Sequence, residues 1–364
     1  MIYFDAAATR AVLPEVMETC KPYFKDSYGN PSALYDMGLD ARRAVEQSRR
    51  TIANILNCSP SEIFFTSGGT ESDNWALNGR GVYCSSIEHH AILNHINNGI
   101  IPCNSQGIVS LNYLKSCLSF ATKETKYKPI VSIMYANNEI GVIEPIEDAA
   151  EIAHHFGCKF HTDAVQYFGH GKIDLSYIDY MSVSGHKIGA MKGIGFLYAK
   201  DGLIASMLKG GEQEKGHRAG TENVPAIVSL AVASDIMYKN LESNNIKLRN
   251  LQSYLYTNIS KNFPMAHLNG TDNWNERLPN ILSFRFDGYQ GEVLQSFLND
   301  FGIAVGTGSA CNSGNGKPSH VLKSIGLSDE ECNSTIRFSY TENNTLDEID
   351  TLINVLKQAI TILR

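Results

Sequence analysis

The 364-residue sequence has little of what marks membrane, secreted or nucleic-acid-binding proteins. No apolar run is long enough to cross a bilayer, and the N-terminus is neither basic nor strongly apolar, so we expect no signal peptide. Positive charge is not in excess: the net charge of −7 argues against direct binding to nucleic acid or an anionic membrane. The eight cysteines form no Cys-x-x-Cys pair and no tight cluster, which favours reduced thiols. We therefore expect a cytoplasmic protein.

The order of secondary-structure patterns in the first 200 residues predicts an α/β fold. The chain is 43% hydrophobic and 19% charged, a globular composition, and its length suits about two domains. Strand and helix patterns alternate, which predicts a mostly parallel, doubly wound sheet covered on both faces. Strands are expected at 62–66, 82–86, 130–134, 158–162, 180–184 and 196–199, with helices at 40–56 and 145–156.

Polar residues follow several of these strands in turn. In doubly wound sheets ligands bind beyond the carboxyl ends of the strands, so a shared site is expected there. The strand Tyr180–Ser184 is followed by Lys187, whose amine becomes a usable nucleophile if it is desolvated. The residues expected at this site are Thr70, His89, Asn138, Asp163, Gln166, Ser184, His186 and Lys187.

A glycine-rich turn, Ser67–Asn74, joins the strand expected at 62–66 to a helix. Such a turn presents free backbone N–H groups at the positive end of a helix, which suits a phosphate. It lacks the ending of a P-loop and is not a dinucleotide fingerprint. Taken alone, this segment indicates a simple tight turn more strongly than a phosphate site.

The remainder of the chain predicts a smaller α/β domain. Long helical patterns run from about 224 to 262 and are followed by a strand at 281–286, a helix at 292–301 and a strand at 335–340. The last helix begins at the capping box Thr345–Glu348 and is expected to bury Leu346 among its apolar residues. We predict a large domain at 13–245 and a small domain made of 1–12 and 246–364.

One cysteine stands apart from the others. Cys311 lies in Gly306–Gly316, a segment with four glycines and three serines or threonines, which predicts an exposed loop that presents a thiol for chemistry. Cys20, Cys58, Cys117 and Cys158 fall in or beside helix and strand patterns and are expected in the core.

A phosphate cradle combined with a lysine, an acid and a glutamine fits pyridoxal phosphate. Lys187 would bond to its aldehyde, Asp163 would pair with its ring nitrogen, and Gln166 and Asn138 would bind its ring oxygen. The phosphate would be held by Gly69, Thr70, Ser184 and His186. Two adjacent histidine pairs, beginning at 89 and 154, lack metal-site spacing, so we expect no metal.

These motifs, in this order, make the chain resemble the cysteine desulfurases of the NifS/IscS type, which are class-V aminotransferases of pyridoxal-phosphate fold type I. The resemblance covers the chain from near residue 5 to near residue 340. It is carried by the segments 68–74, 88–91, 137–141, 163–166, 184–187, 218–223, 308–311 and 336–339.

The resemblance implies roles for further residues. His89 would stack on the cofactor ring and assist proton transfers, and Arg337, with Asn138, would bind the carboxylate of the substrate L-cysteine. Cys311 would attack the substrate sulfur, leaving alanine and a persulfide that passes to an acceptor protein. Thr221 would reach the phosphate of a neighbouring subunit, which implies a homodimer.

The sequence departs from the family pattern in places away from the cofactor set. Tyr35 stands near the position of a frequent histidine, the turn Ala190–Gly193 lacks the usual proline, and Glu212 replaces a glycine. The chain ends at Arg364, just past its last helix, which leads us to expect a sulfur acceptor other than the standard iron–sulfur scaffold.

Two alternatives remain open at this point. Another fold-type I enzyme, such as a selenocysteine lyase or an aminotransferase, would keep Lys187 and Asp163 without needing Cys311. A catalytically inactive scaffold would be free to lose His89 or Arg337, which are both present. The destination of the sulfur is also open among iron–sulfur assembly, tRNA thiolation and DNA phosphorothioation.

Overall fold

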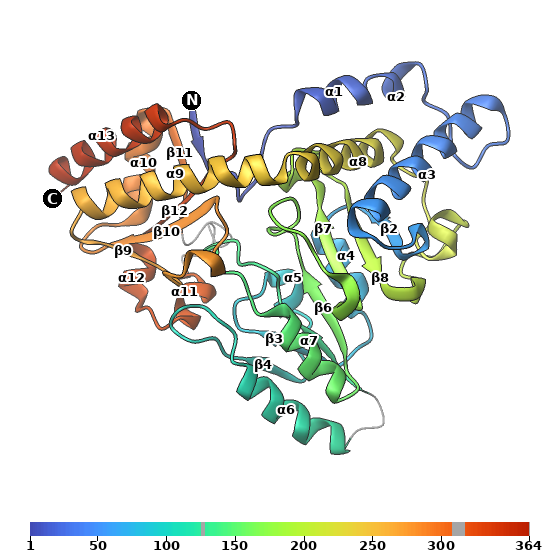
Figure 1. The fold of residues 1–364 in the computed structure, drawn as a ribbon, viewed down its shortest axis with the longest axis horizontal. Helices are drawn as coiled ribbons and strands as arrows, with labels where there is room; N and C mark the ends of the chain where they lie inside the picture. The colour runs from blue at the N-terminus through green and yellow to red at the C-terminus, as the bar shows by residue number, and fades with distance from the viewer. Residues whose placement is uncertain (125–127, 308–316, 364) are drawn as a thin grey trace.

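The computed structural model describes residues 1–124, 128–307 and 317–363. The chain forms two β-sheets that lie side by side, and helix α8 (Val224–Lys239), followed by α9 (Leu241–Asn262), leads from the larger to the smaller (Figure 1). Within these residues no helix combines the length and the apolar character needed to cross a membrane. The predicted α/β class, with a mainly parallel larger sheet and a smaller α/β part, is confirmed.

The larger sheet has seven strands, and only β8 runs against the others. The carboxyl ends of the other six strands therefore meet at one edge, as ligand-binding α/β sheets require. Their order across the sheet is β2 (Ile63–Thr66), β8 (Gly195–Ala199), β7 (Tyr180–Ser184), β6 (Lys159–Asp163), β5 (Ile130–Ser132), β3 (Val82–Ser85) and β4 (Gly99–Ile101).

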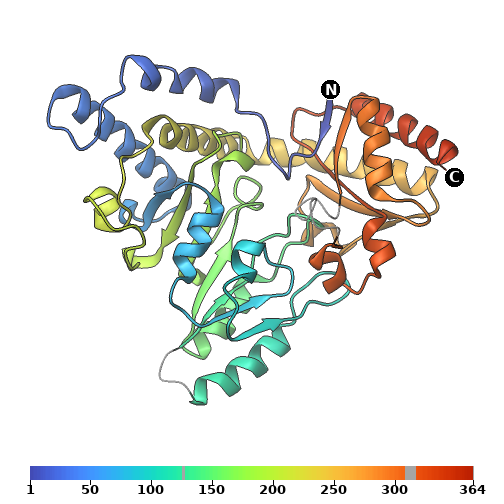
Figure 2. The same cartoon turned by 180° about the vertical axis from the view of Figure 1, so that it is seen from behind.

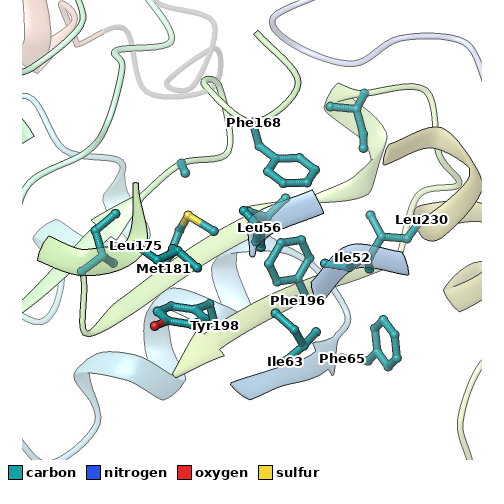
Figure 3. Close-up of a cluster of buried hydrophobic side chains, with 14 of the residues drawn as sticks. Ile52, Leu56, Ile63, Phe65, Phe168, Leu175, Met181, Phe196, Tyr198 and Leu230 are labelled. Carbon is teal, nitrogen blue, oxygen red and sulfur yellow. The ribbon is translucent and has the colours of Figure 1, made fainter. Parts of the chain in front are cut away.

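Helices cover both faces of this sheet because successive strand side chains point to opposite sides. On β2, Phe64 packs against α4 (Gly69–Leu77), whereas Ile63 and Phe65 face the core cluster that includes α3 (Asp36–Leu56) and α8. Figure 3 shows part of this second cluster between β2, β7, β8 and α3. Each fully buried side chain of the size of Ile63 or Phe64 stabilises the fold by roughly 1.5–3 kcal/mol.

The smaller sheet joins the two ends of the chain. Strand β1 pairs in parallel with β11, and the remaining pairs are antiparallel. Helices α9, α10 (Gly291–Asp300) and α13 (Leu346–Ile362) share one hydrophobic core with it; Figure 2 shows this unit from behind. The strand order is β1 (Ile2–Phe4), β11 (Ile303–Thr307), β12 (Thr335–Ser339), β10 (Ile281–Phe286) and β9 (Ala266–Leu268).

Residues 5–12, called the N-terminal arm below, pass from the smaller sheet to the larger. The Ala6 N–H donates to Ser339 O of β12 at 3.0 Å, and the Arg10 N–H donates to His186 O at 3.2 Å. The arm therefore binds both sheets through its backbone.

Several sequence expectations need correction. Strands β4, β9 and β11 were not predicted. The capping box at Thr345 is present, but Leu346 is 46% exposed because the first turn of α13 turns it toward solvent. Cys20 and Cys158 are buried, whereas Cys58 and Cys117 are only half-buried. The predicted domain boundaries remain a prediction.

Candidate active site

A cavity of about 340 Å³ lies where the carboxyl ends of β6 and β7, the start of α4, strand β12 and the N-terminal arm meet. Of the twelve predicted site residues, all but Thr221 and Cys311 line it. Thr221 is exposed and lies away from this cavity, and Cys311 lies outside the described residues. The predicted residues in the wall are Gly69, Thr70, His89, Asn138, Asp163, Gln166, Ser184, His186, Lys187 and Arg337.

Lys187 is brought to the cavity by a single 3₁₀ turn, Gly185–Lys187, directly after the buried strand β7. Its Nζ donates hydrogen bonds to the backbone carbonyl oxygens of Ala7 at 2.6 Å and Ala8 at 2.8 Å, both in the N-terminal arm. Ala7 O also accepts from Gln166 Nε2 at 3.0 Å. The arm thus fixes two of the predicted side chains through main-chain groups.

Asp163 ends strand β6, and its side chain is the carboxylate expected to face a cationic ring nitrogen. Burial raises the pKa of this carboxyl above its usual value. The hydrogen bond from the Val165 N–H and the positive charge of Lys187 act in the opposite direction and limit this rise. The Val165 N–H donates to Oδ1 at 2.8 Å. A buried carboxylate in the wall of a cavity, next to a lysine, is a suitable partner for a protonated heterocycle.

The opposite part of the wall is a backbone cradle at the start of α4. A side chain at Gly69 would place its Cβ 2.7 Å from Val165 Cγ2, so only glycine allows the helix to start this close to the sheet. The free N–H groups of the first turn and the neighbouring Ser184 hydroxyl can bind an anion there.

Two histidines in the wall are neutral. The pKa of His186 is lowered to about 4, mainly by burial and with contributions from the positive charges of Lys187 and Lys192. Burial also lowers the pKa of His89, with smaller contributions from His90 and Lys187. The Ala91 N–H donates to His89 Nδ1 at 3.2 Å, so the ring proton of His89 resides on Nε2.

Arg337 reaches the cavity from β12 with its guanidinium already oriented. Nη2 donates to Asp5 Oδ1 at 2.6 Å, Nη1 donates to Asn138 O at 2.9 Å, and the side chain is 5% exposed. Gly306 leaves the room for this pair, because a Cβ there would lie 2.9 Å from both Arg337 Nη2 and Asp5 Oδ1. A guanidinium held in this way offers a fixed fork to a carboxylate.

Four functional residues escaped the sequence reading: Asp5, Ala7, Ala8 and Asp73. The carbonyls of Ala7 and Ala8 act through the main chain, which leaves no signature in the sequence. A signal did exist for Asp73, because it follows Gly69 by four residues and so shares its helix face. Asp5, at the end of an apolar strand, could have been suspected as a strand-end polar residue.

The residues present fit pyridoxal phosphate. The fit rests on the donor set: a backbone anion cradle that a Cβ at Gly69 would fill, a buried carboxylate at Asp163, and a lysine amine between them in the same wall. Gln166 and Asn138 add polar groups for the ring oxygen.

Comparison with known proteins gives four findings. The model of the class-V aminotransferase family matches residues 2–352. The cysteine desulfurase IscS of Clostridium botulinum (strain Hall) is 41% identical, over 99% of this chain and 94% of that protein. The crystal structure of a NifS-like protein from Rickettsia africae superposes with a TM-score of 0.91 at 33% identity, covering 100% of both chains. A structure described as SspA in complex with cysteine superposes with a TM-score of 0.78 at 31% identity, covering 95% of this chain and 100% of that one.

Proposed function

This chain belongs to the class-V aminotransferase family and is a pyridoxal-phosphate-dependent cysteine desulfurase, and from that premise we propose which of its residues perform the reaction and where the sulfur goes. The grouping of Lys187, Asp163, His89 and Arg337 around one cavity carries the proposal. Each of these side chains comes from a different segment of the chain, so their convergence is a property of the fold.

The side chains divide between binding and proton transfer. Arg337 and Asn138 would bind the carboxylate of L-cysteine, which orients its Cα proton toward Lys187 Nζ. The first turn of α4, Thr70, Ser184 and His186 would hold the cofactor's phosphate, and Gln166 and Asn138 its ring oxygen. Pyridoxal phosphate, when bound, supplies an acceptor for the electrons left on Cα. Asp163 would keep a proton on the ring nitrogen, and His89 would stack on the ring.

Sulfur removal would be performed by Cys311. Its thiolate attacks the substrate sulfur; an S–S bond forms, the Cβ–S bond breaks, and the electron pair of that bond stays on carbon. Protonation of carbon gives alanine, with His89 and Lys187 as the nearby proton carriers. The outer sulfur of the resulting persulfide is the atom passed to an acceptor protein.

Product analysis tests the function directly. The purified, cofactor-loaded protein should convert L-cysteine to alanine, with one equivalent of sulfide released by a thiol reductant for each alanine. If the protein forms alanine from L-selenocysteine but not from L-cysteine, it is a selenocysteine lyase. Pyruvate with ammonia as the main products would also contradict desulfuration.

Asp5 gives a sharper test of the substrate-binding assignment. In Asp5→Ala, Arg337 Nη2 loses its acceptor, the guanidinium is free to turn, and we expect KM for L-cysteine to rise about tenfold or more, with a smaller change in kcat. The matched control is Glu342→Ala, which removes the buried partner of Arg10, an arm residue outside this cavity. A KM that rises equally in both variants would show a general loss of structure.

The homodimer is part of the same proposal. Thr221 is exposed and does not line the cavity of its own chain, which supports a role at the site of a neighbouring subunit. The segment from α1 (Pro14–Cys20) to the start of α3 also exposes large apolar side chains, which is typical of an interface: Met17, Phe24, Tyr28, Leu34 and Tyr35. We expect light scattering to give twice the chain mass, and a monomer that turns over L-cysteine would contradict this.

The sulfur acceptor and the compartment belong to the proposal as well. We propose a cytoplasmic enzyme that hands its persulfide sulfur to a protein acting in iron–sulfur assembly, tRNA thiolation or DNA phosphorothioation. Because the net charge is −7, we expect this chain to reach nucleic acid only through that partner and not by direct binding. Radioactive sulfur from labelled L-cysteine, followed onto candidate acceptors, separates the three destinations.

A further inference from the structure

Asp73 is a second carboxyl group in the wall of the cavity. It lies one turn after Gly69 on α4, on the helix face that packs against β6 and β7, and it lines the cavity together with Asp163. Its side chain is 1% exposed. A buried carboxyl group costs several kcal/mol if it is ionised without a partner.

The surroundings of Asp73 provide no cation within the part of the chain that the structure describes. Its Oδ1 has no hydrogen-bond partner there and lies 3.6 Å from His161 Nε2. Burial lowers the pKa of His161 to about 3, with a contribution from Arg80, so this imidazole is neutral. Its two ring nitrogens lie 2.8 Å from Ser132 Oγ and 3.0 Å from Ser182 Oγ.

The charged neighbours of Asp73 are of its own sign. Burial raises its pKa well above the usual range, Asp163 and Glu88 raise the pKa further, and only a hydrogen bond from Ser182 lowers it. The pKa of Asp163 is also raised by burial, but the Val165 N–H and the positive charge of Lys187 favour its ionised form. Glu88 is itself buried, with a raised pKa. Because two negative charges in a low dielectric repel each other, the carboxyl groups of Asp73 and Asp163 hold one proton between them rather than both being ionised.

We propose that Asp73 is a positioning residue of the cofactor site: it stays a neutral carboxylic acid and so leaves Asp163 as the anion that faces the ring nitrogen. An ionised Asp73 would push the shared proton onto Asp163, and a neutral Asp163 could not stabilise a protonated ring. The inference rests on the proposed role of Asp163 and deepens it by naming the group that sets its charge.

Binding of pyridoxal 5′-phosphate to the full-length apoprotein tests this role without turnover. Asp73→Asn keeps a neutral polar group, so the dissociation constant should stay within about threefold of wild type. Asp73→Ala removes the polar group, and Asp163→Asn removes the anion; each should weaken binding about tenfold or more and alter the absorption spectrum of the bound cofactor. The proposal would be overturned if Asp73→Asn weakened cofactor binding as much as Asp163→Asn does. It would also be overturned if Asp73→Ala bound the cofactor as tightly as wild type.

Glu144→Gln is the matched control. Glu144 is also buried, burial raises its pKa to about 8, and its Oε1 has no hydrogen-bond partner among the described residues, but it does not line the cavity. This variant should leave the affinity for the cofactor and its absorption spectrum unchanged. The control therefore distinguishes the loss of any buried acid from the loss of the acid in the cavity wall.

Infrared spectroscopy reads the protonation state itself. At about pH 8, the difference between the spectra of wild type and Asp73→Asn should contain a protonated-carboxyl C=O band from wild type, because the bands of other buried acids such as Glu88 cancel. Absence of that band from the difference spectrum would overturn the proposal. This measurement decides the question even if Asp73→Ala does not fold. A protein that binds the cofactor as described but makes no alanine would refute the proposed function and leave this inference standing.

Discussion

Replacing Lys187 by arginine is expected to reduce alanine formation from L-cysteine by at least about 10³-fold. Arginine keeps the positive charge and can still donate to the carbonyls of Ala7 and Ala8, so the fold should be little disturbed. A guanidinium, however, stays protonated and can neither bond to an aldehyde nor accept the Cα proton. The measurement is alanine per enzyme per minute, together with borohydride reduction, which should no longer fix the cofactor to the protein.

Lys192→Arg provides the matched control for this experiment. Lys192 is an exposed lysine five positions further along the chain and does not line the cavity. It should keep wild-type turnover and wild-type borohydride labelling. Substantial alanine formation by Lys187→Arg, or a loss of equal size in Lys192→Arg, would remove Lys187 from the role assigned here.

Replacing Cys311 by alanine is expected to lower alanine formation by at least about 10²-fold while pyridoxal phosphate still binds. The position lies outside the described residues, so the expectation rests on chemistry: without this thiolate nothing accepts the substrate sulfur. Mass spectrometry of wild type after L-cysteine should find an additional sulfur atom on the peptide that contains Cys311.

Cys58→Ala is a suitable control, because this thiol is partly accessible. Burial raises the pKa of Cys58 to about 12, with a contribution from Glu62, so it remains a thiol at neutral pH and is a poor nucleophile. It should retain full activity. If Cys311→Ala is as active as Cys58→Ala, the acceptor of the sulfur is a different group, and a lyase or transaminase mechanism becomes the better assignment.

The sequence alone determined much of the larger sheet and most of the cavity wall. Short strand patterns such as Tyr180–Ser184 alternate with helical ones, and this order restricts the fold to a doubly wound sheet. In such a sheet the carboxyl ends of the strands meet. The order of polar residues after successive strands therefore predicts that residues such as Asp163 and Lys187 share a site, and both line one cavity.

The tertiary structure alone decided how these groups are held and charged. Asp5 and Arg337 are 332 positions apart, and only the pairing of β1, β11 and β12 brings them to 2.6 Å. Lys187 is anchored by two main-chain carbonyls, which every residue type possesses, so no sequence pattern could mark them. The protonation of Asp73 follows from burial beside Asp163, and burial is a property of the packed fold. Residue types and their order along the chain specify which chemistry is available, whereas long-range packing fixes the distances and the dielectric environment that make it work.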